Sequence, residues 1–502
     1  MISKEILDTY EMTVGIECHV QLATKTKLFS RADNDARDAD PNSKVTPIDF
    51  GLPGMLPVLN HEAVVLAVKA AKALGSTVAH ESRFDRKHYF YPDLPKGYQT
   101  TQMYQPIIGP GMVKAPLDDG REVAVRIHHA HMEEDAGKLT HYGDYSLVDL
   151  NRAGTPLIEI VSEPDIHSAE EARAYATELY RLMTYAGVTH GNLYHGNMRF
   201  DVNISVAKKG ASELGKRAEV KNLNSFRSVE RAAEYEFKRQ VELLENGERV
   251  VQETRGWHDD KQVTFSQRSK EDAQDYRYMP DADIPPIVLT QSEIDEIQKS
   301  VPRLPASYRK EWEVLELDNS VVNTVIDNQI IAELLGVIYP LQPHQKESVF
   351  TDLNTDETGY KAITRRVFNW FASTPTENID QEKIASGQVG PHRLLELAAI
   401  TDQGKISSTG AKEIFLDLFD SQYNKKTPTE IAESKNLLQV SDTGAVEAIV
   451  DEVLAEPASQ KAVEDIKSGN EKAIGYLVGQ VMKRSKGQAN PAMATKIIKG
   501  KL

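Results

Sequence analysis

The sequence predicts an α+β protein in which a mainly antiparallel sheet is followed by helices. Strand-like alternation of apolar and polar residues recurs up to about Leu289, and helical periodicity replaces it after Pro285-Pro286. The 502 residues also exceed the roughly 250–300 residues at which a single core stops growing. We therefore predict three domains, at residues 1–293, 294–405 and 406–502.

Two segments in the first part show the clearest strand pattern. Residues 14–22 place apolar side chains on one face and Glu17, His19 and Gln21 on the other. Residues 198–206 repeat this alternation. Such strands suit an antiparallel sheet with one packed face and one polar face.

Helix signals separate these strands. Ser168 followed by Glu171 predicts a capping box that opens a helix, and Gly187 can end that helix. A second helix is expected to begin after Ser225 and to run to Asn246-Gly247.

The part of the chain after Pro286 reads as helical throughout. Helix starts are also indicated by Thr427 ahead of Pro428 and by Ser441 ahead of an apolar run at 446–454. The other helices expected in this part are 292–300, 321–339 and 364–371.

Composition is that of an ordinary globular protein, with 40% hydrophobic and 27% charged residues. No apolar run approaches the roughly 18 residues of a membrane span, and the N-terminal residues lack a signal peptide's apolar stretch. A single cysteine, Cys18, allows neither an internal disulfide nor a thiolate zinc cluster. We therefore expect a cytoplasmic protein.

The net charge of −16 opposes indiscriminate binding of polyanions, so any nucleic-acid site must be local. The only strongly basic stretch is 471–502, where seven basic residues face one acidic residue. This tail is either a solvated terminus or a nucleic-acid contact. Lys483, Arg484 and Lys486 lie beside Gly487, which allows close approach of a phosphate, and we assign these three cations to RNA contact.

Charged groups gather on the polar faces of the expected strands. In VAVRIHHAHMEED, a strand aligns His129, His131, Glu133 and Asp135 on one side. Glu159 lies inside the apolar run PLIEIV, where an unpaired carboxylate is costly to bury. Carboxylates with an imidazole and no thiolate suit Mg²⁺ or Mn²⁺. The alternative is a set of solvent-facing or salt-bridged residues.

Two further patterns carry less weight. Residues 210–217 (GASELGKR) approach a phosphate-binding P-loop, but Arg217 replaces the hydroxyl that would hold magnesium, so we interpret them as a hairpin loop. Residues 83–99 interleave aromatic and basic side chains, which can stack bases. The same stretch can equally be a packed loop whose turns are fixed by Pro and Gly.

The strings VGIECHVQL, RKHYFYPDLPKGYQ, HMEEDAGKL, NRAGTPLIEIVSEPD, EVKNLNSFRSVERA and DYRYMPDADIPP, with the closing LVGQVMKRSKGQANP, occur in this order. They resemble the B subunits of heterotrimeric aspartyl/glutamyl-tRNA amidotransferases, over essentially the whole chain. The resemblance implies ATP- and glutamine-dependent conversion of Asp-tRNA(Asn), Glu-tRNA(Gln) or both into the amide forms.

The resemblance also implies partners and a fold. An A subunit would release ammonia from glutamine, a small C subunit would join the other two, and the B subunit would activate the carboxylate with ATP and Mg²⁺. The first domain would be a catalytic cradle similar to glutamine synthetase, followed by a helical domain and a tail domain that binds tRNA.

The family's site residues carry over by motif. The metal ligands implied are Glu17, His19, Glu133 and Glu159. The ammonia route would pass Lys87 and Tyr89. We further expect Glu133 to act in catalysis and Glu134 or Asp135 to accept a proton.

One departure concerns zinc. Many relatives carry two cysteine pairs near the start, whereas the corresponding segments here read FSRA at 29–32 and VTPID at 45–49. We therefore expect no zinc. A competing hypothesis for the whole chain is a non-catalytic tRNA-binding scaffold whose partners do the chemistry, although such a scaffold has no use for clustered carboxylates.

Overall fold

The computed structural model describes residues 3–269, 275–439, 443–468, 470–485 and 489–502. The chain forms two compact units, Met1–Pro305 and Ala306–Leu502. The three predicted domain boundaries remain predictions.

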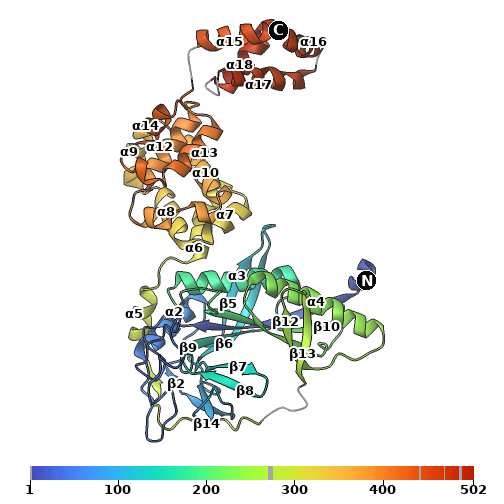
Figure 1. Ribbon diagram of the computed structural model, residues 1–502, viewed down its shortest axis with the longest axis vertical. Helices are drawn as coiled ribbons and strands as arrows, with labels where there is room; N and C mark the ends of the chain where they lie inside the picture. Colours follow the sequence, from blue (N-terminus) through green and yellow to red (C-terminus); the bar gives the residue numbers. More distant parts are fainter. Residues whose placement is uncertain (1–2, 270–274, 440–442, 469, 486–488) are drawn as a thin grey trace. The chain divides into compact units, whose positions relative to one another are not determined.

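The first unit is built on an eight-stranded sheet in the order β13-β12-β11-β10-β1-β9-β6-β5 (Figure 1). All neighbours pair antiparallel except β11 and β12, which are parallel. The predicted α+β class with an antiparallel-rich sheet is confirmed. The strands are β1 (Tyr10–Gln21), β5 (Gly111–Pro116), β6 (Glu122–Glu134), β9 (Pro156–Ser162), β10 (Met198–Lys208), β11 (Ala218–Leu223), β12 (Glu253–His258) and β13 (Val263–Ser269).

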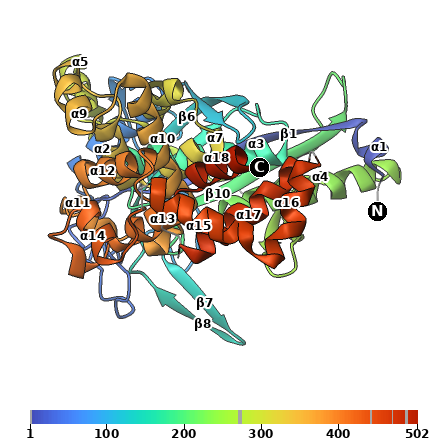
Figure 2. The same cartoon turned by 90° about the horizontal axis from the view of Figure 1, so that it is seen from above.

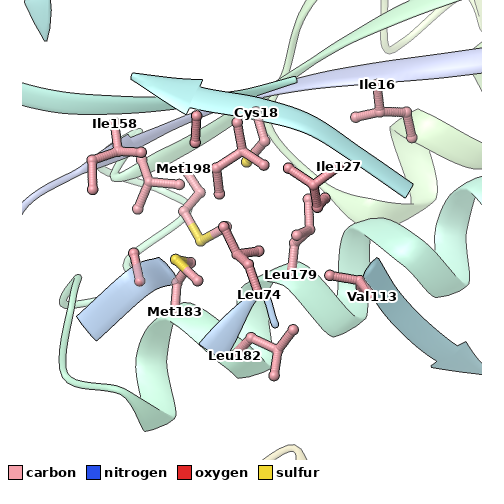
Figure 3. Close-up of a cluster of buried hydrophobic side chains, with 14 of the residues drawn as sticks. Ile16, Cys18, Leu74, Val113, Ile127, Ile158, Leu179, Leu182, Met183 and Met198 are labelled. Carbon is pink, nitrogen blue, oxygen red and sulfur yellow. The ribbon is translucent and has the colours of Figure 1, made fainter. Parts of the chain in front are cut away.

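Helices cover one face of this sheet, as Figure 1 shows for α3 (Ala169–Tyr185) and α4 (Phe226–Glu245). Ile16 and Cys18 on β1 are at most 1% exposed and belong to this core, with Leu179 of α3 (Figure 3). Leu74, which ends α2 (His61–Ala73), joins them. The predicted alternation is therefore confirmed, and it leaves the polar side chains of β1 on the other face.

Shorter elements complete the first unit. Asp85–His88 (β3) pairs with Met279–Pro280 (β14) and with Tyr98–Thr101 (β4). Ile294 packs into the core of the first unit. The remaining elements are α1 (Lys4–Leu7), α5 (Gln291–Lys299), the pair β2 (Glu81–Ser82) and β15 (Ile287–Val288), and the hairpin β7 (Lys138–Tyr142) and β8 (Tyr145–Asp149).

The predicted helix ends are mostly correct. Ser168 accepts from the backbone N–H of Glu171, and Gly187 follows α3 with φ +67°. The Glu171 carboxylate, however, accepts from the backbone N–H of His167, so the predicted capping box does not close on Ser168. Ser225 caps α4 as expected.

The second unit is helical. The single helix predicted for 321–339 is wrong, because Asn328 caps a new helix and divides the segment. Thr427 forms the predicted cap with a reciprocal bond to Glu430, whereas Ser441 lies outside the described residues. The α-helices are α6 (Pro305–Trp312), α7 (Asn319–Ile326), α8 (Gln329–Ile338), α9 (Lys346–Asp352), α10 (Glu357–Ser373), α11 (Gln381–Ala385), α12 (Pro391–Asp402), α13 (Ser408–Asp417), α14 (Pro428–Ser434), α15 (Thr443–Ala455), α16 (Gln460–Lys467), α17 (Ile474–Arg484) and α18 (Pro491–Lys501).

Among the described residues, no single helix is long and apolar enough to cross a membrane. Helices α7 and α8 reach that length and composition only when taken together, and they are bent by 117°.

Leu179→Ala is expected to lower the free energy of unfolding of the first unit by about 2–5 kcal/mol, because Leu179 is fully buried between α3 and the sheet. Leu214→Ala, at a side chain that is 65% exposed, should change it by less than about 0.5 kcal/mol. Urea unfolding followed by near-ultraviolet circular dichroism measures both. Equal effects of the two substitutions would contradict the packing described here.

Candidate active site

The polar face of the sheet holds a largely buried cluster of carboxylates and imidazoles, whose side chains are 5–21% exposed. His19 on β1 lies opposite Glu159 on β9, and Glu159 lies opposite His131 on β6. Glu133 lies two residues further along β6 and is 4% exposed. Period-two alternation puts all four side chains on one face. The sequence predicts this orientation for His19 on β1 and for His131 and Glu133 on β6.

The distances within this cluster are short. The Nε2 atom of His19 lies 3.5 Å from carboxylate oxygens of both Glu133 and Glu159. The Nε2 atom of His131 lies 3.3 Å from Glu159 and 3.8 Å from Glu133. One ligand atom from each of His19, Glu133 and Glu159 falls within a group spanning 4.8 Å. This spacing fits one divalent ion.

The charges in this cluster shift the pKa values of its own members. Burial lowers the pKa of His19, but Glu159 and Glu133 outweigh this effect and raise it to about 9. The same carboxylates raise the pKa of His131 to about 10 against the effect of burial. Burial raises the pKa of Glu159, yet the two imidazoles hold it well below its usual range. Perturbed groups gathered in a hollow are typical of functional sites.

Glu17 lies outside this group of three. Its carboxylate lies with those of Asp201 and Glu219 in a second group, on β1, β10 and β11. Lys221 bridges Asp201 and Glu219 at 3.0 Å each. Burial first, and then the charge of Glu159, raises the pKa of Glu17. The four residues named from sequence thus divide between two neighbouring groups.

The two carboxylates that follow Glu133 have different surroundings. Glu134 points away from Glu133, where it pairs with Lys96 and accepts from the backbone N–H of Thr100. Asp135 lies one residue beyond β6 and pairs with Arg152 and Arg199. Burial raises the pKa of Asp135, but the two guanidinium groups outweigh burial and lower it.

A hollow of about 200 Å³ adjoins the cluster. Tyr89 lines it together with His19, Glu133 and Asp135, and burial raises the pKa of Tyr89. Lys87 does not line this hollow; its Nζ lies 5.0 Å from the centre of the Tyr276 ring. The Tyr89 ring lies 6.2 Å, centre to centre, from the same Tyr276 ring. The two predicted ammonia-route residues therefore share one aromatic neighbour, although only Tyr89 lines the hollow.

The aromatic and basic stretch at 83–99 is partly packed and partly exposed. Tyr98 lies under the Arg86 guanidinium, 4.6 Å from ring centre to carbon. Phe90 and Tyr91 are 78% and 57% exposed. The loop at 210–217 joins antiparallel β10 and β11, which confirms the hairpin interpretation.

Residues 29–32 and 45–49, which replace the cysteine pairs of many relatives, are joined by hydrogen bonds. Ser30 donates to Asp49, and Thr46 donates to the same carboxylate from its N–H and its hydroxyl. Lys27, fully buried, lies 3.8 Å from Asp49. Cys18 is buried in the core.

The tail residues have mixed surroundings. Lys483 and Arg484 end α17. Arg484 pairs with Glu452 at 2.9 Å and with Glu456. Lys486 lies outside the described residues. One of the three predicted RNA contacts is therefore already engaged within the tail.

The fold brings to the site several residues that sequence reasoning does not assign to it. Strand alternation puts His131 on the correct face but does not mark it as a partner of Glu159. Arg199 and Asp201 belong to the polar face of their strand, and strand pairing brings them beside His19 and Glu17. Arg152 follows Asn151 in a turn, and no periodicity could have signalled it.

Two family models match most of this chain. Residues 12–295 match the GatB/GatE catalytic domain, and residues 356–502 match the GatB domain. A protein of Bdellovibrio bacteriovorus, named as the B subunit of an aspartyl/glutamyl-tRNA(Asn/Gln) amidotransferase, is 42% identical over 98% of this chain and 99% of its own length. Proteins of the same name from Carboxydothermus hydrogenoformans and Alkalilimnicola ehrlichii are 41% and 43% identical over 98% of this chain and 99% of their own lengths. The chain belongs to the GatB family.

Proposed function

We propose that this chain is the B subunit of a multi-subunit, glutamine-dependent tRNA amidotransferase, a carbon–nitrogen ligase that works in translation. It would convert Asp-tRNA(Asn), Glu-tRNA(Gln) or both into the amide forms in the cytoplasm. An amidase A subunit would supply ammonia, and a small C subunit would join the two. The observation that carries this proposal is the His19–Glu133–Glu159 cluster on the sheet's polar face, in a chain of this family.

We infer that the polar face is a cradle similar to that of glutamine synthetase. A side-chain carboxylate resists attack by ammonia because it would have to expel an oxide. Transfer of the γ-phosphoryl group of ATP to that carboxylate gives an acyl phosphate and ADP. Ammonia then attacks the carbonyl carbon, the bond between that carbon and the phosphate oxygen breaks, and one proton passes from the nitrogen, by way of a protein base, to the departing phosphate.

His19, Glu133 and Glu159 would hold Mg²⁺, since two carboxylates and one imidazole suit a hard or borderline ion. When bound, the ion neutralises charge on the transferring phosphoryl group. Glu17 would contribute from the adjacent group. His131, 3.3 Å from Glu159, would fix the orientation of that carboxylate.

Ammonia must arrive unprotonated and away from bulk water. We propose that Lys87 and Tyr89 belong to its route, with Tyr89 at the end that opens on the hollow beside Glu133. Asp135 reaches this hollow and Glu134 does not, which favours Asp135 as the first proton acceptor. Burial raises the pKa of Asp135 but Arg199 and Arg152 lower it further, so Asp135 is a weak base and would hold the proton only briefly before passing it on.

The scaffold hypothesis assigns no chemistry to this chain. ATP hydrolysis that depends on misacylated tRNA discriminates between the two hypotheses. In a scaffold, Glu133→Gln would leave this hydrolysis unchanged in the assembled complex, whereas the proposed site requires its loss.

Glu133→Gln and Glu159→Gln are each expected to abolish amidation and to weaken Mn²⁺ binding, because each removes one negative ligand. Basal glutamine hydrolysis by the A subunit should remain, since that chemistry occurs on another chain. Glu122→Gln, at an exposed end of β6, is the matched control. Amidation assays and Mn²⁺ titration followed by electron paramagnetic resonance measure these effects. Near-normal amidation by both variants would refute the metal assignment.

The purified chain should contain no stoichiometric zinc, because Cys18 is its only thiol and is buried in the core. Elemental analysis by plasma mass spectrometry after dialysis checks this. One zinc per chain would contradict it.

Replacing Lys483, Arg484 and Lys486 with alanine should raise the KM for tRNA and flatten its salt dependence, with kcat at saturating tRNA nearly unchanged. Lys483→Ala alone separates RNA contact from loss of the Arg484 ion pairs. Lys310→Ala, an exposed cation outside the tail, is the control. Binding by the triple variant within about twofold of wild type at low salt would leave the tail without this role.

A further inference from the structure

Three imidazole rings form a hydrogen-bonded row along β6. The Nδ1 atom of His131 lies 3.2 Å from Nε2 of His129, and the Nδ1 atom of His129 lies 2.7 Å from Nδ1 of His128. The row begins at the candidate metal site, because Nε2 of His131 lies 3.3 Å from Glu159. It ends at His128, which is exposed. The row therefore connects a carboxylate ligand with the surface of the protein.

A β-bulge creates this row. Ile127 and His129 lie opposite neighbouring residues of β9, so His128 is one extra residue in β6. Odd-numbered residues of β6 are buried up to Ile127, whereas the buried residues beyond the bulge include the even-numbered Ala130 and Met132. The bulge therefore puts both His128 and His129 on the polar face of the sheet. A regular strand would turn one of these two imidazoles toward the core.

The surroundings of His131 determine how its ring must lie. Its Nε2 atom faces the carboxylates of Glu159 and Glu133, and ionised carboxylates only accept, so this nitrogen carries a hydrogen. Its Nδ1 atom then accepts from His129 when the ring is neutral and donates to His129 when the ring is charged. In both states the same hydrogen bond holds the ring. Without it, rotation about the second side-chain torsion could bring a ring carbon to the carboxylates in place of Nε2.

The orientation of His131 matters because this ring lies against both carboxylate ligands. Its Nε2 atom is 3.8 Å from Oε2 of Glu133, whose other oxygen, Oε1, lies 3.5 Å from His19. The same Nε2 atom shares Oε2 of Glu159 with His19. A misplaced His131 ring would leave both carboxylates free to turn away from the ion position beside His19.

The outer side of His129 is not held by core packing. A groove of about 560 Å³ opens there, lined by His128 and His129 together with Met103 and Tyr104. Met103 and Tyr104 are themselves more than half exposed. The hydrogen bond to His128 therefore gives the His129 ring a second point of attachment on its open side.

We propose that His129 is a positioning residue for the candidate metal site, which holds the His131 ring so that both carboxylate ligands face the ion. His128, the extra residue of the bulge, fixes the other nitrogen of His129. Groups that orient metal ligands from outside typically contribute about 10–100-fold to metal affinity. Because it concerns the ion assigned above, this role of His129 rests on the proposed function.

His129→Leu in the assembled complex is expected to weaken Mn²⁺ binding about tenfold, because leucine forms no hydrogen bond with His131. His129→Gln should bind Mn²⁺ within about twofold of wild type, since an amide can both donate and accept. Titration followed by electron paramagnetic resonance measures both affinities. Equal weakening by the two substitutions would overturn the inference, and so would wild-type affinity in the leucine variant.

A double-mutant cycle with His131 separates positioning from general damage to β6. If His129 acts through His131, His129→Leu should change Mn²⁺ affinity by less than about twofold in a His131→Gln background. Additive losses would show that the leucine substitution harms the site by another route, and the inference would fail.

His141→Leu is the matched control, because His141 is also a strand histidine whose Nδ1 atom forms a hydrogen bond, here with Ser146. It lies on the β7–β8 hairpin, which extends outward from the first unit (Figure 2). This variant should bind Mn²⁺ as wild type does. A loss equal to that of His129→Leu would make the effect unspecific and refute the role of His129.

The outcome is separable from failure of the proposed function, because Mn²⁺ binding requires neither tRNA nor glutamine. If the variants behave as described but the wild-type complex amidates no misacylated tRNA, the proposed function fails and the role of His129 stands. If the complex amidates tRNA and His129→Leu binds Mn²⁺ like wild type, only the role of His129 fails. A wild-type complex that binds no Mn²⁺ would overturn that role even if it amidates tRNA.

Discussion

The central constraint on this structure is the position of the Glu159 carboxylate, whose side chain is only 17% exposed, in the middle of an apolar strand. A carboxylate in that position must be paired, because removing an isolated charge from water costs several kcal/mol. The two neighbouring strands provide His19 and His131, both within 3.5 Å of it. The register of β1, β9 and β6 is therefore tied to the site, since a shift of one residue would turn every partner to the apolar face.

The same alternation explains how one sheet has a packed face that belongs to the core and a polar face that holds the candidate site. Odd-numbered residues from Glu17 to Gln21 face the polar side, whereas Ile16, Cys18 and Val20 are buried under helices. Glu133 and Glu134 repeat this division on β6. Glu133 joins the imidazoles, and Glu134 forms a separate pair with Lys96. Adjacent acidic residues thus acquire different environments without any change in backbone conformation.

Much of the fold and part of the site could be predicted from sequence because both depend on local periodicity. Period two correctly oriented Glu17, His19 and Glu133 within their strands, and the cost of an unpaired carboxylate in an apolar run singled out Glu159. Periodicity could not determine which strands are neighbours, and strand order places Glu17 beside Asp201 instead of in the group of three. The break at Asn328 was missed for a related reason: apolar periodicity continues through the residue, and only its side-chain cap reveals a new helix.

Residues contributed by turns were the least predictable, and they have a marked effect on the surroundings of the site. Arg152 lies in the turn between β8 and β9, where its guanidinium pairs with Asp135 and lines a polar cavity of about 270 Å³ that Gln21 and Asn197 also line. Asp135 is largely buried, and two guanidinium groups neutralise its charge. Each of these guanidinium groups lines a different space on the polar face of the sheet. Arg199 lines the hollow beside His19 and Glu133, and Arg152 lines the polar cavity. An anionic ligand that reached either space would therefore meet no unpaired negative charge at Asp135, because both guanidinium groups already neutralise that carboxylate.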